Sequence, residues 1–310
     1  MAYISFVFSF YNEEQTLPLL IRRIREVMTK ESFDYEMIFV NDASTDDSLK
    51  ILAQETAAKE KGEIVVVNLS RRFGVEESFL AGIETARGDA LILMYTDLQD
   101  PPEVVLKMLQ CYKEGAEVVH TIRKKRIGEH PLKNIAAFLA YRIVGKLSDI
   151  KIPYDAGEFK LISKNVAKHL LNLPEVEPYL RGLIPWVGFK QNYVEYEMQP
   201  RGAGRSKIAL FGKKAWTVFL SGVISFSDFP IYGILLTGLC GFFVSTALGF
   251  FLIARADLGW INGPMALIIF LWSTLMLSLG LVGLYILKTY KNTRGRPRYI
   301  IQKIIRDQRP

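Results

Sequence analysis

The 310-residue sequence contains only two cysteines, Cys111 and Cys240. Neither has a histidine or a second cysteine at metal-ligand spacing, and two cysteines cannot build a disulfide framework. A zinc protein and a disulfide-stapled secreted domain are therefore excluded. Two glycine motifs are also missing, because no GxGxxG follows the first predicted strand and GxxxxGK[ST] does not occur. A Rossmann dinucleotide site and a P-loop are accordingly not expected.

Residues 1–287 lack any excess of charge, so the net charge of +7 lies entirely in residues 288–310. A nucleic-acid-binding protein spreads positive charge over a folded face, and nucleic acid is therefore not an expected partner. A basic segment beside an apolar one is typical of a membrane-surface anchor. Charge alone leaves a solvated, disordered terminus as the alternative for this basic tail.

Two long stretches, residues 231–253 and 264–287, contain no charged residue. At about 1.5 Å per residue each helix would reach roughly 35 Å, enough to cross a hydrocarbon core of about 30 Å. We expect a transmembrane hairpin over residues 231–287. Lysines precede it and the basic tail follows it, so the positive-inside rule places both flanks in the cytoplasm.

Residues 207–230 contain apolar side chains at helical spacing, with polar ones on the other side. This pattern predicts an amphipathic helix in the membrane interface, leading into the first span. An ordinary core-facing helix of the soluble domain remains the alternative.

Residues 1–206 alternate between short apolar runs and amphipathic stretches. The runs at 4–10, 37–40, 64–67 and 90–94 are typical of buried parallel strands. This order predicts an α/β domain with a doubly wound, mostly parallel, Rossmann-like sheet. In such sheets ligands bind at the carboxyl ends of the strands.

Polar side chains follow three of these predicted strands. Tyr11 and Glu13 follow the first, Asp42 the second, and Asp97 and Gln99 the fourth. The Asp42 carboxylate can accept hydrogen bonds from a uracil or guanine edge, with the flat ring of Tyr11 beside it. Asp97 is placed to bind a hard divalent cation. Each aspartate taken alone can instead cap the next helix, but three polar groups at one sheet edge favour a ligand site.

Six stretches occur in a distinctive order: SFVFSFYNEE (Ser5–Glu14), VNDASTDDS (Val40–Ser48), DLQDPPE (Asp97–Glu103), GEFKL (Gly157–Leu161), RGLIPWVG (Arg181–Gly188) and RGAGRSK (Arg201–Lys207). With the two apolar runs they resemble the family 2 inverting glycosyltransferases that load a sugar onto a polyprenyl phosphate. Among these the chain is most similar to bactoprenol glucosyltransferases, and it is related to dolichyl-phosphate mannose synthases. The resemblance covers nearly the whole chain and implies a GT-A-type fold.

The resemblance also implies a site for the donor. Its nucleotide-sugar contacts fall on Tyr11, Glu13, Asp42 and Arg123. The cation, Mg²⁺ or Mn²⁺, falls on Asp97 and Gln99. A UDP-sugar is favoured over a GDP-sugar as the donor.

The remaining implied roles concern the acceptor and the reaction. Contacts to the acceptor phosphate fall on Arg201, Ser206 and Lys207, directly before the predicted interfacial helix. The catalytic residues are Asp97 and Glu158, the latter at the acidic position of the family's Gly-Asp-Phe-Arg motif. A lipid phosphate is mostly a dianion near pH 7 and needs little help from a base. Glu158 is therefore expected to orient the donor sugar.

The sequence departs from the family pattern at several positions. Tyr95 replaces the first acid of the Asp-x-Asp motif, Ala43 replaces a glycine, and Gly-Asp-Phe-Arg has become Gly-Glu-Phe-Lys at 157–160. Tyr95 supports a second hypothesis, a catalytically degenerate paralogue that binds nucleotide sugar or partner proteins without turnover. A processive polysaccharide synthase would need a QxxRW-type motif, which LIPWV at 183–187 does not provide.

The leading hypothesis is a transferase that moves a sugar from a nucleotide donor to undecaprenyl phosphate with inversion. Its product would be a polyprenyl-phosphate monosaccharide for modifying cell-envelope glycans. The expected location is the bacterial inner membrane, as a multi-pass protein whose catalytic domain faces the cytoplasm. A homo-oligomer is left open.

Overall fold

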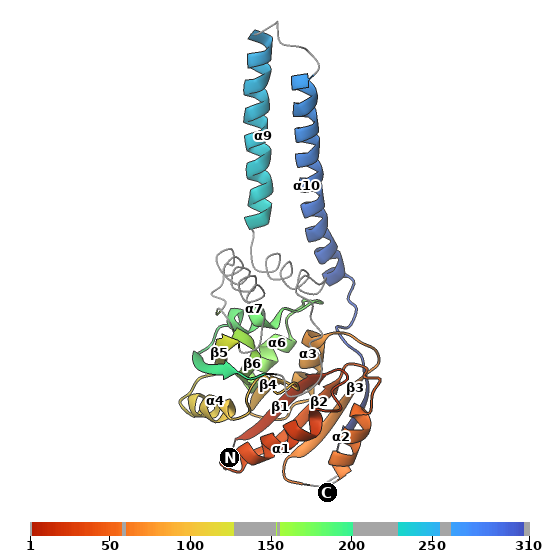
Figure 1. Ribbon diagram of the computed structural model, residues 1–310, viewed down its shortest axis with the longest axis vertical. Coiled ribbons are helices and arrows are strands. Elements are labelled where there is room, and N and C mark those ends of the chain that lie inside the picture. The colour runs from red at the N-terminus through yellow and green to blue at the C-terminus, as the bar shows by residue number, and fades with distance from the viewer. Residues whose placement is uncertain are drawn as a thin grey trace. The chain divides into compact units, whose positions relative to one another are not determined.

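The computed structural model describes residues 2–57, 60–126, 153, 156–200, 229–254 and 262–306 (Figure 1). The chain divides into two compact units. The first consists of Met1–Gly222 together with Arg296–Pro310, and the second is Val223–Gly295. The chain therefore leaves the first unit and returns to it near its C-terminal end.

Within the described residues, the first unit contains an eight-stranded sheet in the order β7-β5-β6-β4-β1-β2-β3-β8. β1, β2, β3 and β4 run parallel to one another. β6 is antiparallel to β4 and to β5, β7 is parallel to β5, and β8 is antiparallel to β3. The strands are β1 (Tyr3–Phe10), β2 (Asp34–Asn41), β3 (Glu63–Leu69), β4 (Ala90–Tyr95), β5 (Val118–Arg126), β6 (Ala156–Ser163), β7 (Gln191–Met198) and β8 (Ile301–Arg306).

The central strands are apolar on both faces because helices cover both faces of the sheet. Phe6 and Phe8 of β1 belong to the core layer shared with α1, α2 and α4. Val7 points to the opposite face, where Gly82 brings α3 close to β1. The helices among the described residues of this unit are α1 (Leu17–Met28), α2 (Ser48–Ala57), α3 (Val75–Thr85), α4 (Val104–Lys113), α6 (Lys164–Leu171) and α7 (Leu180–Trp186). The prediction of a doubly wound α/β sheet is confirmed, and each predicted apolar run lies within β1, β2, β3 or β4.

Part of the predicted basic tail, residues 288–310, is a strand of this sheet. Ile301–Arg306 form β8, which pairs with β3 at one edge. Just before it, the Ser70 amide donates to the Ile300 carbonyl (3.0 Å), and the Tyr299 hydroxyl donates to Glu84 (2.7 Å). The isoleucines of β8 favour a strand, and β8 hydrogen-bonds to the edge of the sheet that β3 would otherwise leave unpaired. The basic charge of this segment had predicted only a position at the membrane surface.

The second unit contains two long helices, α9 (Phe229–Ala254) and α10 (Asn262–Thr293), which pack against each other. Each predicted span falls inside one of them. Among the described residues, Phe270–Thr293 of α10 is long and apolar enough to cross a membrane, while the apolar stretch of α9 is shorter, Ile231–Gly241. Residues 207–228 of the predicted interfacial helix lie outside the described residues.

Candidate functional site

The topology of the sheet brings the predicted site residues to one edge. β1, β2 and β4 are parallel, so Tyr11, Asp42 and Asp97 follow their carboxyl ends on the same side. β6 is antiparallel to β4, so Glu158 lies near the start of β6 at that edge. β5 is antiparallel to β6 and ends there too, with Arg123 near its end. The prediction that Tyr11, Asp42 and Asp97 share one edge of the sheet therefore agrees with the strand register, and Glu158 and Arg123 join them there, which was not predicted.

Asp42 and Tyr11 belong to a compact group with Arg72. Asp42 is 4% exposed, and its Oδ1 accepts hydrogen bonds from the backbone amides of Phe73 (2.7 Å) and Gly74 (3.3 Å). The Arg72 Nε lies 3.9 Å from Asp42 Oδ2. The Arg72 guanidinium also lies over the Tyr11 ring, 3.9 Å from its centroid. The arrangement presents a fixed carboxylate, a flat ring and a positive charge side by side.

Two adjoining loops carry this group and are held together by side-chain hydrogen bonds. The Asn12 amide donates to Ser44 Oγ (2.9 Å), and the Thr45 amide donates to Asn12 Oδ1 (2.8 Å). Asn12 and Ala43 have φ angles of 53° and 59°, in the left-handed region that glycine favours. The glycine that the family pattern has at position 43 is explained by this conformation.

Glu13 has a structural place at the start of α1. Its backbone carbonyl accepts from the amides of Thr16 (3.1 Å) and Leu17 (3.2 Å). Its own amide donates to Ser48 Oγ (3.0 Å), and its side chain accepts from Thr16 Oγ1 (3.2 Å). Glu13 therefore joins the loop after β1 to α2 and lies next to the Tyr11 group.

The loop after β4 carries Asp97 and Gln99. Asp97 is half-buried, and its Oδ1 accepts a hydrogen bond from the Gln99 amide (3.2 Å). Between them Leu98 has a φ of 61° and is 2% exposed, so its side chain anchors the loop in the core. In the part of the chain that the structure describes, no group of three or more His, Cys, Asp or Glu residues could hold a metal. A cation here would depend on Asp97, Gln99 and oxygens of its ligand.

Arg123 lies in a buried polar group that the sequence predicted only in part. Its Nε donates to the Tyr196 hydroxyl (2.9 Å), and its Nη2 lies 3.4 Å from Asp100 Oδ1. The Tyr196 hydroxyl also donates to Asp100. Burial lowers the pKa of Arg123, but Asp100 and Tyr196 outweigh it and hold that pKa above its ordinary value. The guanidinium therefore stays charged and joins the β4 loop to β5 and β7.

The glycine of the GEFKL stretch is required by this arrangement. A Cβ at Gly157 would lie 2.6 Å from Nη2 of Arg123. Asp100 also lies within a quoted stretch, DLQDPPE, but nothing in the sequence indicated its partners. Pairing of β5 with β7 places Tyr196 directly beside Arg123.

Glu158 belongs to a second buried charged group. It is 1% exposed, and its Oε1 accepts from Nε of Arg181 in α7, while its buried Oε2 has no hydrogen-bond partner among the described residues. Lys160 is also 1% exposed, and burial lowers its pKa to about 8 although Glu158 opposes this. Burial, and then Glu158, raise the pKa of Glu76 in α3 well above its ordinary value. Two acids and two bases thus meet between β6, α3 and α7.

Tyr95 lies beside this charged group. Burial, followed by the charge of Glu158, raises the pKa of its hydroxyl well above the ordinary value. Its ring contacts Phe79 edge-on, with centroids 5.7 Å apart. The position that the family pattern gives to an acid therefore holds a neutral phenol, which adds no charge to the Asp97 loop.

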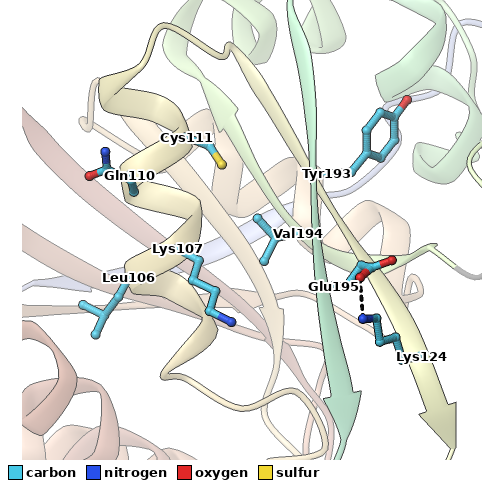
Figure 2. A pocket seen from close by; sticks show the side chains of 8 residues that line it. All are labelled: Leu106, Lys107, Gln110, Cys111, Lys124, Tyr193, Val194 and Glu195. Carbon is cyan, nitrogen blue, oxygen red and sulfur yellow. Dashed lines mark ion pairs between the residues drawn. The ribbon is translucent and has the colours of Figure 1, made fainter.

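Three predicted acceptor-phosphate residues, Arg201, Ser206 and Lys207, lie outside the described residues. The structure also contains a groove away from the predicted site residues. It is an open groove of about 620 Å³ between α4 and β7, lined by Lys107, Cys111 and Val194 among others (Figure 2). None of the predicted site residues lines this groove.

Comparisons with known proteins agree with this fold. Residues 5–171 match the family described as glycosyl transferase family 2. An uncharacterized glycosyltransferase of Bacillus subtilis is 36% identical over 305 residues, which cover 96% of this chain and 93% of that protein. The prophage bactoprenol glucosyl transferase homolog of Escherichia coli is 33% identical over 306 residues, covering 97% and 99%.

A solved structure shows the same fold. Glucosyl-3-phosphoglycerate synthase from Mycobacterium tuberculosis, in complex with Mn²⁺, UDP-glucose and phosphoglyceric acid, aligns with a TM-score of 0.50 at 16% identity. The alignment covers 72% of this chain and 78% of that one. It confirms the predicted Rossmann-like, GT-A-type α/β architecture.

Proposed function

The chain belongs to glycosyl transferase family 2, and from this premise we propose that it transfers a sugar from a nucleotide-sugar donor to a polyprenyl phosphate. The observation that carries the proposal is that the Tyr11–Arg72–Asp42 group lies at the same edge of the sheet as the Asp97 loop. Relatives matched over nearly their full length are named bactoprenol glucosyl transferases, which supports a polyprenyl phosphate, undecaprenyl phosphate in particular, as acceptor.

In this proposal the donor's base lies against Tyr11 and Asp42. A carboxylate accepts hydrogen bonds from the N–H edge of uracil, and the two backbone amides already on Asp42 Oδ1 keep it in place. Glu13 supports the adjoining loop, and Arg72 adds positive charge beside the base site. We propose a UDP-sugar over a GDP-sugar because of the family resemblance, since the Asp42 carboxylate accepts hydrogen bonds from a guanine edge as well.

Asp97 and Gln99 fit a divalent cation that is held mainly by the donor. Mg²⁺ commonly binds only one or two carboxylates and completes its coordination shell with phosphate oxygens and water. The half-buried Asp97 carboxylate and the neighbouring Gln99 amide are therefore enough ligands from the protein. When bound, such a cation neutralises charge on the departing diphosphate. Mg²⁺ and Mn²⁺ are the proposed cofactors.

The reaction needs positioning more than proton removal. An oxygen of the acceptor phosphate attacks the anomeric carbon as the bond to the diphosphate breaks, and the nucleoside diphosphate leaves from the opposite face, which inverts the configuration. The acceptor is mostly a dianion near neutral pH, so no strong base is required. Glu158, held by Arg181, orients the donor sugar, and Arg123 provides positive charge for the diphosphate. Arg201, Ser206 and Lys207 are proposed to hold the acceptor phosphate.

The proposed location is the inner membrane, with the catalytic domain of residues 1–206 in the cytoplasm. The apolar α10 span supports membrane association, and the long apolar α9 supports a hairpin over 231–287. Residues 207–230 would lie in the interface, where a lipid phosphate emerges. The product would supply a sugar for modifying cell-envelope glycans.

A product assay tests the proposal directly. Purified protein in detergent is mixed with undecaprenyl phosphate, Mg²⁺ or Mn²⁺, and a panel of UDP-, GDP- and dTDP-sugars, and the glycolipid is detected by mass. We expect a polyprenyl-phosphate sugar that disappears with EDTA and falls at least ~100-fold with Asp97→Ala, because electrostatic groups on the leaving diphosphate have effects of that order.

The neutral Tyr95 favours a second candidate function, a paralogue that binds nucleotide sugar without turnover. Nucleotide binding with no product from any donor would support that candidate and contradict the transferase. Retention of full activity in Asp97→Ala would contradict the assigned cation position.

A further inference from the structure

Three side-chain amides form a continuous hydrogen-bonded row across β2, β3 and β8. Nδ2 of Asn41 donates to Oδ1 of Asn68 (2.7 Å), and Nδ2 of Asn68 donates to Oε1 of Gln302 (2.9 Å). Asn41 is 1% exposed, and it lies directly opposite Asn68 in the parallel register of β2 and β3. We call Asn41, Asn68 and Gln302 the amide row.

One backbone amide fixes the direction of the whole row. The Ser44 amide donates to Oδ1 of Asn41 (2.9 Å). A backbone N–H can only donate, so the oxygen of Asn41 must face Ser44 and its NH₂ must face Asn68. The same reasoning turns the NH₂ of Asn68 toward Gln302. Asn41 and Asn68 therefore each accept and donate, and donation runs from the loop after β2 toward β8.

An irregularity of β8 brings Gln302 to its place. Asn68 pairs with Lys303 and Leu69 pairs with Ile301, so Gln302 is the extra residue at a bulge. A bulge changes the direction of the side chain at that point of a strand. The other side chains of β8 are those of Ile, Lys and Arg, none of which can accept a hydrogen bond from Asn68.

The amide row ends on the loop that carries Asp42. Beyond Ser44, the hydrogen bonds continue to the neighbouring loop, since the Asn12 amide donates to Ser44 Oγ (2.9 Å) and the Thr45 amide to Asn12 Oδ1 (2.8 Å). Asn12 directly follows Tyr11. The row thus joins the C-terminal strand to both loops of the Tyr11–Arg72–Asp42 group.

We propose that Asn68 and Gln302, acting through Asn41, are positioning residues for the nucleotide end of the donor site. This inference rests on the proposed function, because it takes the Tyr11–Arg72–Asp42 group as the base site. It adds that the C-terminal strand, which follows both apolar helices in the chain, takes part in donor binding without touching the donor. Loss of the row leaves the loops after β1 and β2 less ordered and lowers affinity for the nucleotide.

The test replaces the central amide in full-length protein in detergent. Asn68→Leu has a similar shape and cannot form either hydrogen bond. Asn68→Asp can still accept from Asn41 and, once the terminal amide of Gln302 turns over, from Gln302 as well. Lys303→Ala is the matched control, because Lys303 is an exposed neighbour on β8 outside the row.

Two measurements are made on each variant: UDP affinity with donor and acceptor kinetics, and hydrogen exchange of peptides spanning 41–48. For Asn68→Leu we expect roughly tenfold weaker UDP binding and a raised donor KM, since loss of the partly buried Asn41–Asn68 hydrogen bond changes an equilibrium constant by up to about that factor. The acceptor KM and kcat stay unchanged, and exchange at 44–45 becomes faster. For Asn68→Asp and Lys303→Ala we expect a UDP affinity and a donor KM within about twofold of the wild-type values.

Each contrary outcome is distinct. Unchanged exchange at 44–45 in Asn68→Leu overturns the role of the row in holding the loop, whether or not a nucleotide binds. Faster exchange with unchanged UDP affinity overturns the positioning role. A wild-type chain that binds none of UDP, GDP or dTDP overturns the proposed function and with it the link to the donor, while exchange alone then decides whether the row orders the loop.

Discussion

At the scale of single residues, Lys160 gives the stability of the folded domain a specific pH dependence. Its ammonium group is buried, and its pKa falls from 10.5 to about 8. Below pH 8 the lysine is protonated in both the folded and the unfolded state. Between pH 8 and 10.5 the unfolded chain binds more protons, so this group makes the free energy of unfolding rise with pH, by roughly 3 kcal/mol in all.

Lys160→Met removes that rise, since methionine has nearly the same length and no charge. We expect the variant to be more stable than the wild type at pH 7 and the difference to shrink by pH 10. Thermal unfolding of detergent-solubilised protein across this range measures it, with exposed Lys168→Met as control. A difference that stays constant with pH would show that Lys160 does not titrate in this window.

Single residues also mark the limit of what the sequence predicts about the site. Tyr11, Asp42 and Asp97 were predictable because each follows an apolar strand within two residues of its end, and the carboxyl ends of parallel strands lie at one edge of the sheet. Arg181 and Tyr196 were not, because their contacts with Glu158 and Arg123 depend on how α7 and β7 pack onto the sheet. No spacing along the chain encodes those contacts.

At the scale of elements, the position of α3 depends on one small residue. A Cβ at Gly82 would lie 2.3 Å from Cγ1 of Val7 and 3.0 Å from Cγ2 of Val40, so α3 rests directly on β1 and β2. The chain just before α3 supplies the amides of Phe73 and Gly74 to Asp42. The packing of α3 on the sheet therefore helps to set the position of the Asp42 carboxylate.

Gly82→Ala is expected to push α3 away from the sheet and to destabilise the domain by about 1–3 kcal/mol, the usual cost of overpacking. UDP affinity should fall with it, because the amides on Asp42 move. Val7→Ala in the same chain removes the clashing atom and should restore most of the loss, which thermal unfolding and UDP titration of the double variant can measure. Additive losses in the double variant would contradict the contact.

Elements also differ in how well the sequence specifies them. β1 to β4 were predicted from continuous apolar runs, which are typical of strands buried on both faces. β8 was missed because IQKIIR alternates weakly and lies among basic residues, so its charge dominated the interpretation. An edge strand is decided by the partner it meets, and that partner, β3, lies more than two hundred residues earlier.

At the scale of the whole molecule, the return of the chain to the first unit changes what the basic C-terminal segment is expected to do. Residues 231–287 were predicted as a hairpin followed by an anchor for the membrane surface. Instead, Arg296–Pro310 belong to the same compact unit as the catalytic sheet. The catalytic unit is therefore made of two separate parts of the chain, and a truncated protein that ends before the hairpin would lack one strand of the sheet.

Deletion of residues 301–310 tests whether this segment acts as a strand of the sheet or as an anchor for the membrane surface. Without β8 the hydrogen-bonding groups of β3 are left unpaired at an exposed edge, which promotes association between chains. We expect a lower thermal midpoint and increased light scattering in detergent. The matched variant, Lys303→Gln, removes an exposed charge and keeps the strand, so it should keep the wild-type midpoint and bind anionic vesicles more weakly. If the deletion left the midpoint unchanged and only the vesicle binding fell, the segment would act as a surface anchor and β8 would contribute nothing to the fold.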